Sequence, residues 1–180
     1  MTARAAAPTK PSAPIADAPP ALPSARSDPV AGAAAAYSIP VRVYYEDTDA
    51  GGIVYYANWL RYFERARTDW LRALGAVHTR LAEDAGLAFV VREIAVDYRR
   101  PARLDDLLRV EVGLLEAKRA SWTLWQCARL DGRPEPLVAA TVRIAAIRRD
   151  DGRAAAFPRW LNERVAAALP HHQRRQANVE

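Results

Sequence analysis

Three carboxylates lie within four consecutive positions of this sequence, and two glycines follow them. The carboxylates are Glu46, Asp47 and Asp49. Gly51 and Gly52 come next and permit unusual dihedral angles and close approach of the backbone. A carboxylate in this position is able to attack a carbonyl carbon or to activate a water molecule. Both reactions need a donor for the oxyanion that develops, and free N–H groups at a helix start supply one.

The helix that this chemistry requires is predicted to begin at Asn58. Apolar residues recur from there at helical spacing: Trp59, Tyr62, Phe63, Ala66, Trp70, Ala73 and Leu74. Asn58 is a favourable N-cap, and Gly75 is well placed to end the helix. For Asp47 we expect a structural role as a cap. Asp49 lies nine residues before Asn58, too far to cap that helix, so we expect it to be the catalytic carboxylate.

Strand-like segments surround this helix. SIPVRVYYED predicts a strand before it, and VHTRLAEDAG predicts a short second helix that ends near Gly86. Four strand-like runs follow: LAFVVREIAVDYRR, LLRVEVGLLEA, SWTLWQCARL and LVAATVRIAAIRR. Asp131 and Gly132 are a turn signal between the last two. FPRWLNERVAAAL predicts a closing helix with Pro158 in its first turn.

This order of elements predicts an α+β fold, in which one long helix packs on a five-stranded antiparallel sheet. One helix cannot cover both faces of such a sheet, so we expect the second face to meet another subunit. A chain of 180 residues is long enough for one domain with a hydrophobic core. We assign that domain to residues 37–169.

The first 36 residues have a different composition, with 14 alanines, 7 of the 13 prolines and no aromatic residue. Such a segment buries too little apolar surface to offset its ordering entropy, so we expect it to be disordered. Its prolines also interrupt the apolar core that a secretory signal needs. A start codon assigned too far upstream explains the same composition, and both explanations stay open. Residues 170–180 are expected to form a flexible tail.

The composition disfavours several classes of protein. The single cysteine, Cys127, excludes an intrachain disulfide, fits a reducing cytoplasm and is expected in the core. No apolar run approaches the ~20 residues that cross a bilayer. The net charge of +5 is spread along the chain, without the basic stripe of a nucleic-acid-binding protein. His78, His171 and His172 are too scattered for a metal site or a Ser-His-Asp triad.

The segment that carries the carboxylates resembles a known family. VRVYYEDTDAGGIVYYANWLRYFERARTDWLRALG is similar to the signature of the hotdog-fold hydroxybenzoyl-CoA thioesterase family, and within it to the acyl-CoA thioesterases associated with the Tol-Pal cell-envelope system. The likeness continues through FVVREIAVDYRRPARLDDLLRVE and covers roughly Pro40 to Pro158. The pattern D-T-D-x-x-G-x-V-Y, followed by an F-E-x-A-R-like segment, is far more specific than a lone D-x-D.

The resemblance implies a hotdog fold, assembled as a homodimer or a dimer of dimers with active sites at the subunit interface. It implies hydrolysis of an acyl-CoA thioester, or of an acyl-carrier-protein thioester, to a free acid and a thiol. No metal or redox cofactor is expected, since coenzyme A is part of the substrate. The expected location is the cytoplasm, and no motif specifies the acyl group.

The family's functional residues fall on named positions of this chain. Its catalytic carboxylate falls on Asp49, as nucleophile or as general base, and its oxyanion donor falls on the backbone N–H of Tyr56. The Tol-Pal branch usually has histidine at the position of Tyr56, whereas the hydroxybenzoyl branch can have tyrosine, and a backbone donor tolerates this change. We also expect Gly52 to contact the substrate and Trp59 to line the acyl pocket.

Four further residues are candidates for substrate binding. Lys118 and Arg119, which precede Ser121, match a basic segment that meets the phosphates of coenzyme A in family members. A solvated turn has the same composition, so this alternative stays open. Glu64 lies eight residues after Tyr56, and either faces the site or forms a structural ion pair.

Two other functions compete with hydrolysis. Hydration of an enoyl thioester usually needs an Asp/His pair, and no histidine lies near Asp49 in the sequence. A non-catalytic binding protein for acyl-carrier protein or for envelope partners is the second rival. Release of thiol from acyl-CoA distinguishes an enzyme from such a binding protein.

Overall fold

The structure, a computed structural model, describes residues 34–168. The predicted disordered segment, apart from residues 34–36, and the predicted C-terminal tail lie outside the described residues. The elements in chain order are β1 (Tyr37–Arg42), the 3-10 turn η1 (Tyr45–Asp47), α1 (Asn58–Ala73), α2 (His78–Asp84), β2 (Leu87–Tyr98), β3 (Leu107–Ala117), β4 (Ser121–Leu130), β5 (Pro136–Arg148) and α3 (Arg159–Ala166).

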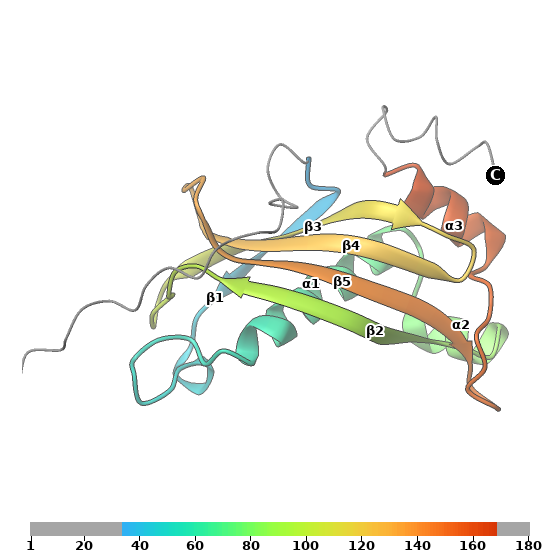
Figure 1. Cartoon of the computed structure of the whole chain (residues 1–180), viewed down its shortest axis with the longest axis horizontal. Helices are drawn as coiled ribbons and strands as arrows, with labels where there is room; N and C mark the ends of the chain where they lie inside the picture. The colour runs from blue at the N-terminus through green and yellow to red at the C-terminus, as the bar shows by residue number, and fades with distance from the viewer. Residues whose placement is uncertain (1–33, 169–180) are drawn as a thin grey trace, which may run out of the picture.

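The five strands form one sheet in the order β1-β3-β4-β5-β2, and every neighbouring pair is antiparallel (Figure 1). Consecutive strands β3, β4 and β5 form the middle of the sheet. The two strands that flank α1 in the sequence, β1 and β2, form its edges. The predicted α+β architecture, with one long helix and a five-stranded antiparallel sheet, is confirmed.

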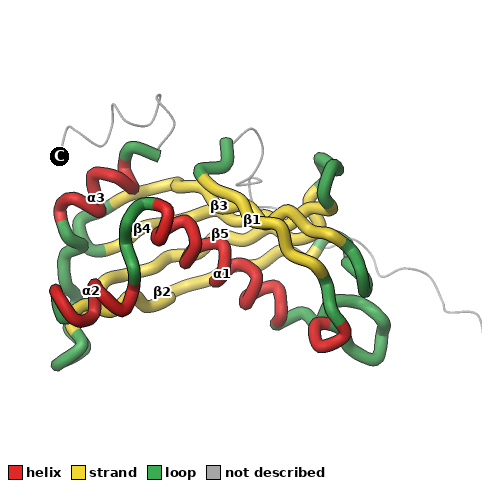
Figure 2. The backbone as a smooth tube through the Cα atoms, turned by 180° about the vertical axis from the view of Figure 1, so that it is seen from behind, coloured by secondary structure: helices red, strands yellow, loops and turns green. Residues whose placement is uncertain are grey.

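The long helix α1 crosses one face of the sheet and lies against β1 and β3 (Figure 2). Five residues of its predicted apolar face are buried: Trp59, Tyr62, Phe63, Ala66 and Trp70. Leu71 is also buried, whereas Ala73 is exposed and Leu74 is half-buried. With 3.6 residues per turn, Leu71 lies at the edge of the buried stripe. Ala73 lies on the stripe but is the last residue of the helix, and it is left uncovered.

The opposite face of the sheet carries a small apolar cluster formed by Trp125, Cys127 and Ala139. Their neighbour Leu124 belongs to the main core, as the alternation of side chains along β4 requires. The predicted burial of Cys127 is confirmed. That this face meets another subunit stays a prediction.

The ends of most elements follow their sequence signals. Helix α1 ends at Ala73, just before Gly75, and α2 ends before Gly86. Asp131 and Gly132 connect β4 to β5, as predicted. Pro158 precedes α3 instead of lying in its first turn. Among the helices of residues 34–168, none is long and apolar enough to span a bilayer.

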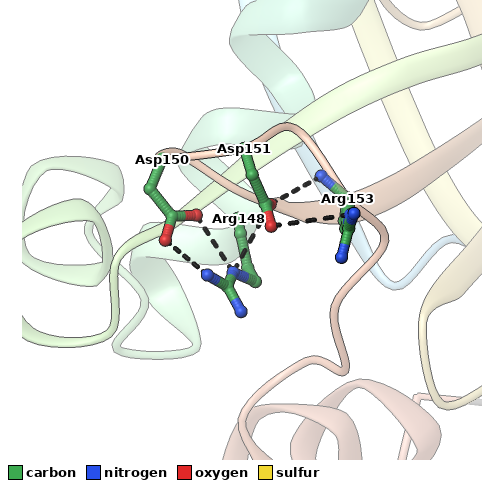
Figure 3. A network of polar contacts seen from close by, with 4 residues as sticks. All are labelled: Arg148, Asp150, Asp151 and Arg153. Carbon is green, nitrogen blue, oxygen red and sulfur yellow. Dashed lines mark hydrogen bonds and ion pairs between the residues drawn. The ribbon is translucent and has the colours of Figure 1, made fainter.

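The turn after β5 is held by charged side chains (Figure 3). Arg148 Nε donates to Asp150 Oδ1 at 3.0 Å, and the backbone N–H of Arg153 donates to Asp151 Oδ1 at 3.0 Å. The hydrogen bond from the Arg148 guanidinium lowers the pKa of the Asp150 carboxyl to about 2. These groups are largely solvated, so they define a surface turn near the start of β2.

Candidate active site

Asp49 lies in a tight turn between two short extended segments. Thr48 and Val54 form an isolated antiparallel bridge, which closes the base of the turn. The Asp49 N–H donates to Ile53 O at 3.0 Å, and the Gly52 N–H donates to Asp49 O at 2.9 Å. Gly52 has a φ of 70°, a conformation that side chains disfavour, so glycine is required there by the backbone alone.

The Asp49 carboxylate is fixed by its own turn and faces solvent. Its Oδ1 accepts the Gly51 N–H at 2.8 Å. Oδ2 has no hydrogen-bond partner among residues 34–168, and the side chain is exposed. One carboxylate oxygen is therefore held in place while the other is available to a substrate or a water molecule.

Asp47 has a structural role, but it does not cap the long helix. Its buried carboxylate accepts the Tyr44 N–H at 2.9 Å through Oδ2 and so caps the 3-10 turn η1. Burial raises the pKa of Tyr62, and the nearby Asp47 carboxylate raises it further, so the Tyr62 hydroxyl stays protonated. Asp47 therefore caps η1 and not α1, because the chain makes a complete turn between Asp47 and the start of α1.

Asn58 joins this turn to the helix. The prediction that Asn58 is the N-cap is wrong, because Ala57 occupies that position with helical dihedral angles, φ −76° and ψ −21°. Asn58 is instead the first helical residue, and its buried side chain points back to the preceding loop. Its Nδ2 donates to Asp47 O at 3.0 Å and to Glu46 O at 3.4 Å. The Tyr55 N–H donates to the same Asp47 carbonyl at 2.8 Å.

Tyr56 presents a free backbone donor just before α1. Its N–H has no acceptor among residues 34–168. The carbonyl of the same peptide group, Tyr55 O, accepts the Asn58 N–H at 2.9 Å, which orients the donor. The neighbouring Tyr56 hydroxyl raises the pKa of Tyr55, and the charge of Asp49 adds a smaller contribution in the same direction. Asp49 and the Tyr56 N–H both belong to the loop between η1 and α1.

Trp59 lies in the main core and is only 3% exposed. Its ring meets Tyr62 edge to face at 5.8 Å between centroids. Within one protomer its surface is covered by core contacts, so its place in an acyl pocket stays a prediction. Contact between Gly52 and substrate is likewise a prediction, and the exposure of Gly52 is compatible with it.

Glu64 forms the ion pair that the sequence left as one of two possibilities. Its carboxylate pairs with Arg67 and accepts the Thr68 hydroxyl at 3.2 Å. Arg67 is buried and also donates to Gln126 Oε1 at 2.5 Å, while Gln126 Nε2 donates to Phe63 O at 2.9 Å. Sequence reasoning missed Arg67 and Gln126. The available signal was an arginine on the apolar stripe of a helix, which requires a buried partner.

Two hollows border Glu64. One, of about 380 Å³, lies between α1, α2 and β2, and the other, of about 670 Å³, is an open groove between α1 and β1. Leu71, Leu81, Phe89 and Ile144 make the first hollow largely apolar. Neither Asp49 nor Tyr56 lines either hollow. In a single protomer, both of these hollows are thus separate from the Asp49 turn.

The basic segment lies far from Asp49 within one protomer. Lys118 and Arg119 occupy the β3–β4 turn, whereas the Asp49 turn lies near the start of β3 (Figure 1). The 11 residues of β3 separate them by about 35 Å. The Lys118 side chain pairs with Glu116 at 3.0 Å, and the backbone N–H of Lys118 donates to Ser121 O at 2.8 Å. Within one protomer, the structure therefore does not bring Lys118, Arg119 and Ser121 close to Asp49.

Metal ligands do not gather in the described part of the chain. Residues 34–168 contain no group of three or more His, Cys, Asp or Glu side chains that would hold an ion. His78 is exposed at the start of α2, with its ring 5.5 Å from that of Phe89. The other two histidines lie outside the described residues.

Fold and site together define an α+β protein with one long helix on a five-stranded antiparallel sheet and an exposed carboxylate in the turn before that helix. Residues 43–165 match the family model described as the thioesterase-like superfamily. The match covers more than half of the chain, so the chain belongs to this superfamily. The family prediction made from the sequence is confirmed.

Individual relatives agree with this assignment. The acyl-CoA thioesterase YbgC of Haemophilus influenzae is 47% identical over 135 residues, which cover 75% of this chain and 95% of the relative. A solved structure of a probable thioesterase from Bartonella henselae is 36% identical with a TM-score of 0.63, covering 68% of this chain and 100% of that one. A Thermus thermophilus thioesterase, solved in complex with coenzyme A and zinc, is 28% identical with a TM-score of 0.60, covering 74% and 96%.

The Asn58 side chain offers a direct test of how the site is held together. Asn58→Asp replaces an amide donor by a carboxylate that faces two carbonyl oxygens, so we expect a loss of about 1–3 kcal/mol in the free energy of unfolding. Urea denaturation measures this loss. A residue that only occupied a helix start would tolerate or favour aspartate, because negative charge is stabilising there. A stability equal to or above that of the parent would therefore contradict the assigned role.

Proposed function

We propose that this chain is an acyl-CoA thioesterase in which Asp49 and the backbone N–H of Tyr56 form the reacting centre. The enzyme class, a thioester hydrolase, is supported by the superfamily match and by the names of its relatives. The assignment of Asp49 and Tyr56 rests on the geometry of the turn that contains Asp49. It holds one Asp49 oxygen and leaves the other open, next to a helix start whose N–H has no protein acceptor within residues 34–168.

In the reaction, the Tyr56 N–H donates to the thioester carbonyl oxygen and stabilises the negative charge that develops on it. As a general base, Asp49 takes a proton from water while the water oxygen attacks the carbonyl carbon. The C–S bond of the tetrahedral intermediate then breaks, and the proton passes to the departing thiolate. As a nucleophile, Asp49 instead attacks the carbonyl carbon and expels the thiolate, which leaves a mixed anhydride. Water then hydrolyses the anhydride to the free acid, which regenerates the Asp49 carboxylate, and a proton of that water neutralises the thiolate. Both schemes need an ionised carboxylate, and neither uses a metal or a redox cofactor.

The proposed site is completed by a second copy of the chain. Strand β2 is a 12-residue edge strand that, among residues 34–168, pairs only with β5, and its side chains Val91 and Ile94 are exposed. A long apolar edge strand is a template for pairing with another chain. Antiparallel pairing of β2 with its copy brings the Tyr98 end of one subunit beside the Leu87 end of the other.

This dimer explains the position of the basic segment. The β3–β4 turn lies at the same end of the sheet as Leu87, because Ser121 pairs with Ala145 and Leu87 pairs with Arg148 on β5. Lys118 and Arg119 of one subunit therefore approach the Asp49 turn of its partner. There they bind the phosphates of coenzyme A, and the apolar hollow beside Glu64 faces the same shared site.

The cellular location, the protein partners and the competing hydratase reaction are also matters of proposal. A cytoplasmic location fits the single cysteine. Acyl-carrier protein as a partner and a role in the Tol-Pal system follow only from the resemblance. Within one protomer, the Asp/His pair that the hydratase alternative needs does not form, because His78 lies on α2 at the other end of the sheet from Asp49 (Figure 1).

The Asp49→Asn variant tests the catalytic assignment. It keeps the size of the side chain but removes its charge, so turnover should fall on the order of 10²-fold or more while folding and binding of acyl-CoA persist. Steady-state release of thiol measures turnover, and calorimetry measures binding. Asp47→Asn is the matched control, and it should mainly lower stability because Asp47 caps η1. Near-parental turnover in Asp49→Asn would favour the binding-protein alternative.

The basic turn is tested by a double substitution, Lys118→Ala with Arg119→Ala. Loss of charge-assisted contacts to phosphate should raise KM roughly tenfold and leave kcat nearly unchanged. A truncated thioester without the nucleotide serves as the control substrate, and its constants should not respond. Equal constants for full-length acyl-CoA in variant and parent would remove both residues from the site.

A further inference from the structure

Tyr98 links the end of the edge strand to the start of the long helix. It is the last residue of β2, and its hydroxyl donates to the backbone carbonyl of Tyr56 at 3.1 Å, across 42 positions of sequence. The rings of Tyr98 and Tyr56 also meet edge to face, with 6.5 Å between centroids. No other contact described for residues 34–168 joins a side chain of the sheet to the residue that carries the proposed oxyanion donor.

Tyr56 needs such support because little else holds it. Its side chain is 61% exposed, so core packing does not fix the residue. On its N-terminal side, the Tyr55 carbonyl accepts the Asn58 N–H at 2.9 Å. On its C-terminal side, the Tyr56 carbonyl accepts the Tyr98 hydroxyl. The two bonds restrain the peptide groups on either side of the Tyr56 Cα, and so they fix the direction of its N–H.

We infer that Tyr98 is a positioning residue for thioester hydrolysis, which acts through its hydrogen bond to the Tyr56 carbonyl to aim the Tyr56 N–H at the developing oxyanion. This inference rests on the proposed function. Tyr98 donates one proton to a main-chain oxygen and exchanges none with the substrate. Its effect is therefore on turnover, since a misdirected oxyanion donor weakens the transition state more than the bound substrate.

The electrostatic surroundings keep Tyr98 in the state that this role requires. Partial burial raises the pKa of Tyr98, and the nearby Tyr56 hydroxyl raises it further. The phenol consequently stays protonated, and remains a donor, across neutral and mildly alkaline pH. The neighbouring Tyr56 side chain raises the pKa of Tyr55 in the same way, so Tyr55 also stays protonated near Asp49.

Tyr98→Phe removes one oxygen atom and keeps the ring contact with Tyr56. We expect kcat to fall about tenfold, less than the 10²–10³ that follows complete removal of an oxyanion donor, with KM changed less than about twofold. The shape of the pH–rate profile should stay the same, because Tyr98 does not titrate in the reaction. Tyr45→Phe is the matched control, since Tyr45 is 81% exposed and its hydroxyl has no partner among the described residues. That variant should keep the parental kcat.

A second variant distinguishes the backbone contact from the ring contact. In a Tyr56→Ala background the carbonyl and N–H remain, so Tyr98→Phe should again lower kcat by a similar factor. Loss of the effect in that background would show that Tyr98 acts through the Tyr56 ring, and would overturn the inference. An unchanged kcat in Tyr98→Phe, or an equal fall in Tyr45→Phe, would overturn it as well. A purely structural role would appear as a lowered Tm with the parental kcat.

Separate results test the role of Tyr98 and the thioesterase activity. If Asp49→Asn abolishes thiol release and Tyr98→Phe leaves kcat intact, the thioesterase proposal stands and the role of Tyr98 is wrong. If the parent protein releases no thiol from any acyl-CoA, the proposed function itself is wrong.

Discussion

The candidate active site depends on the carbonyl group of Asp47, which connects the turn to the start of α1. This carbonyl group accepts both the Tyr55 N–H and the side-chain amide of Asn58, at 2.8 Å and 3.0 Å. Asp47 lies two residues before Asp49, the proposed catalytic carboxylate, and Asn58 opens α1, so one oxygen atom fixes the turn against the helix start. The Tyr56 N–H, in the same loop, keeps no acceptor among residues 34–168, so these contacts hold the loop to the helix start without occupying that donor.

The topology of the sheet determines which other residues lie near this Asp47 contact. Strands β1 and β2 are the two edges, so the segment that joins β1 to α1 emerges at the rim of the sheet. The end of β2 reaches the same rim and supplies Tyr98. At the opposite end of the sheet lie the basic β3–β4 turn and the apolar hollow of about 380 Å³. In the proposed dimer, antiparallel pairing of β2 strands unites the two ends, so that each domain carries both halves of the proposed site and the second subunit brings them together.

Local signals predicted the elements, and long-range contacts account for the errors. The helical stripe from Trp59 to Trp70 identified α1, because burial of one helix face leaves a clear period in sequence. Asn58 was misassigned as an N-cap because the same residue type also donates to carbonyl groups of a preceding loop, and spacing does not separate these roles. Arg67 was missed because its partner Gln126 lies 59 positions away on β4. The distance between Lys118 and Asp49 depends on topology, which the motif pattern does not contain.

We propose that the turn held by the Asp47 carbonyl group is a hydrolytic centre and not merely a binding site. Its most direct measurement is thiol release by the parent protein from a panel of short-chain, long-chain and aromatic acyl-CoA thioesters, with the carboxylic acid product quantified in parallel. The account predicts catalytic turnover of at least one substrate, with one thiol and one acid formed per thioester consumed. Saturable binding of the panel without release above the uncatalysed rate would contradict it.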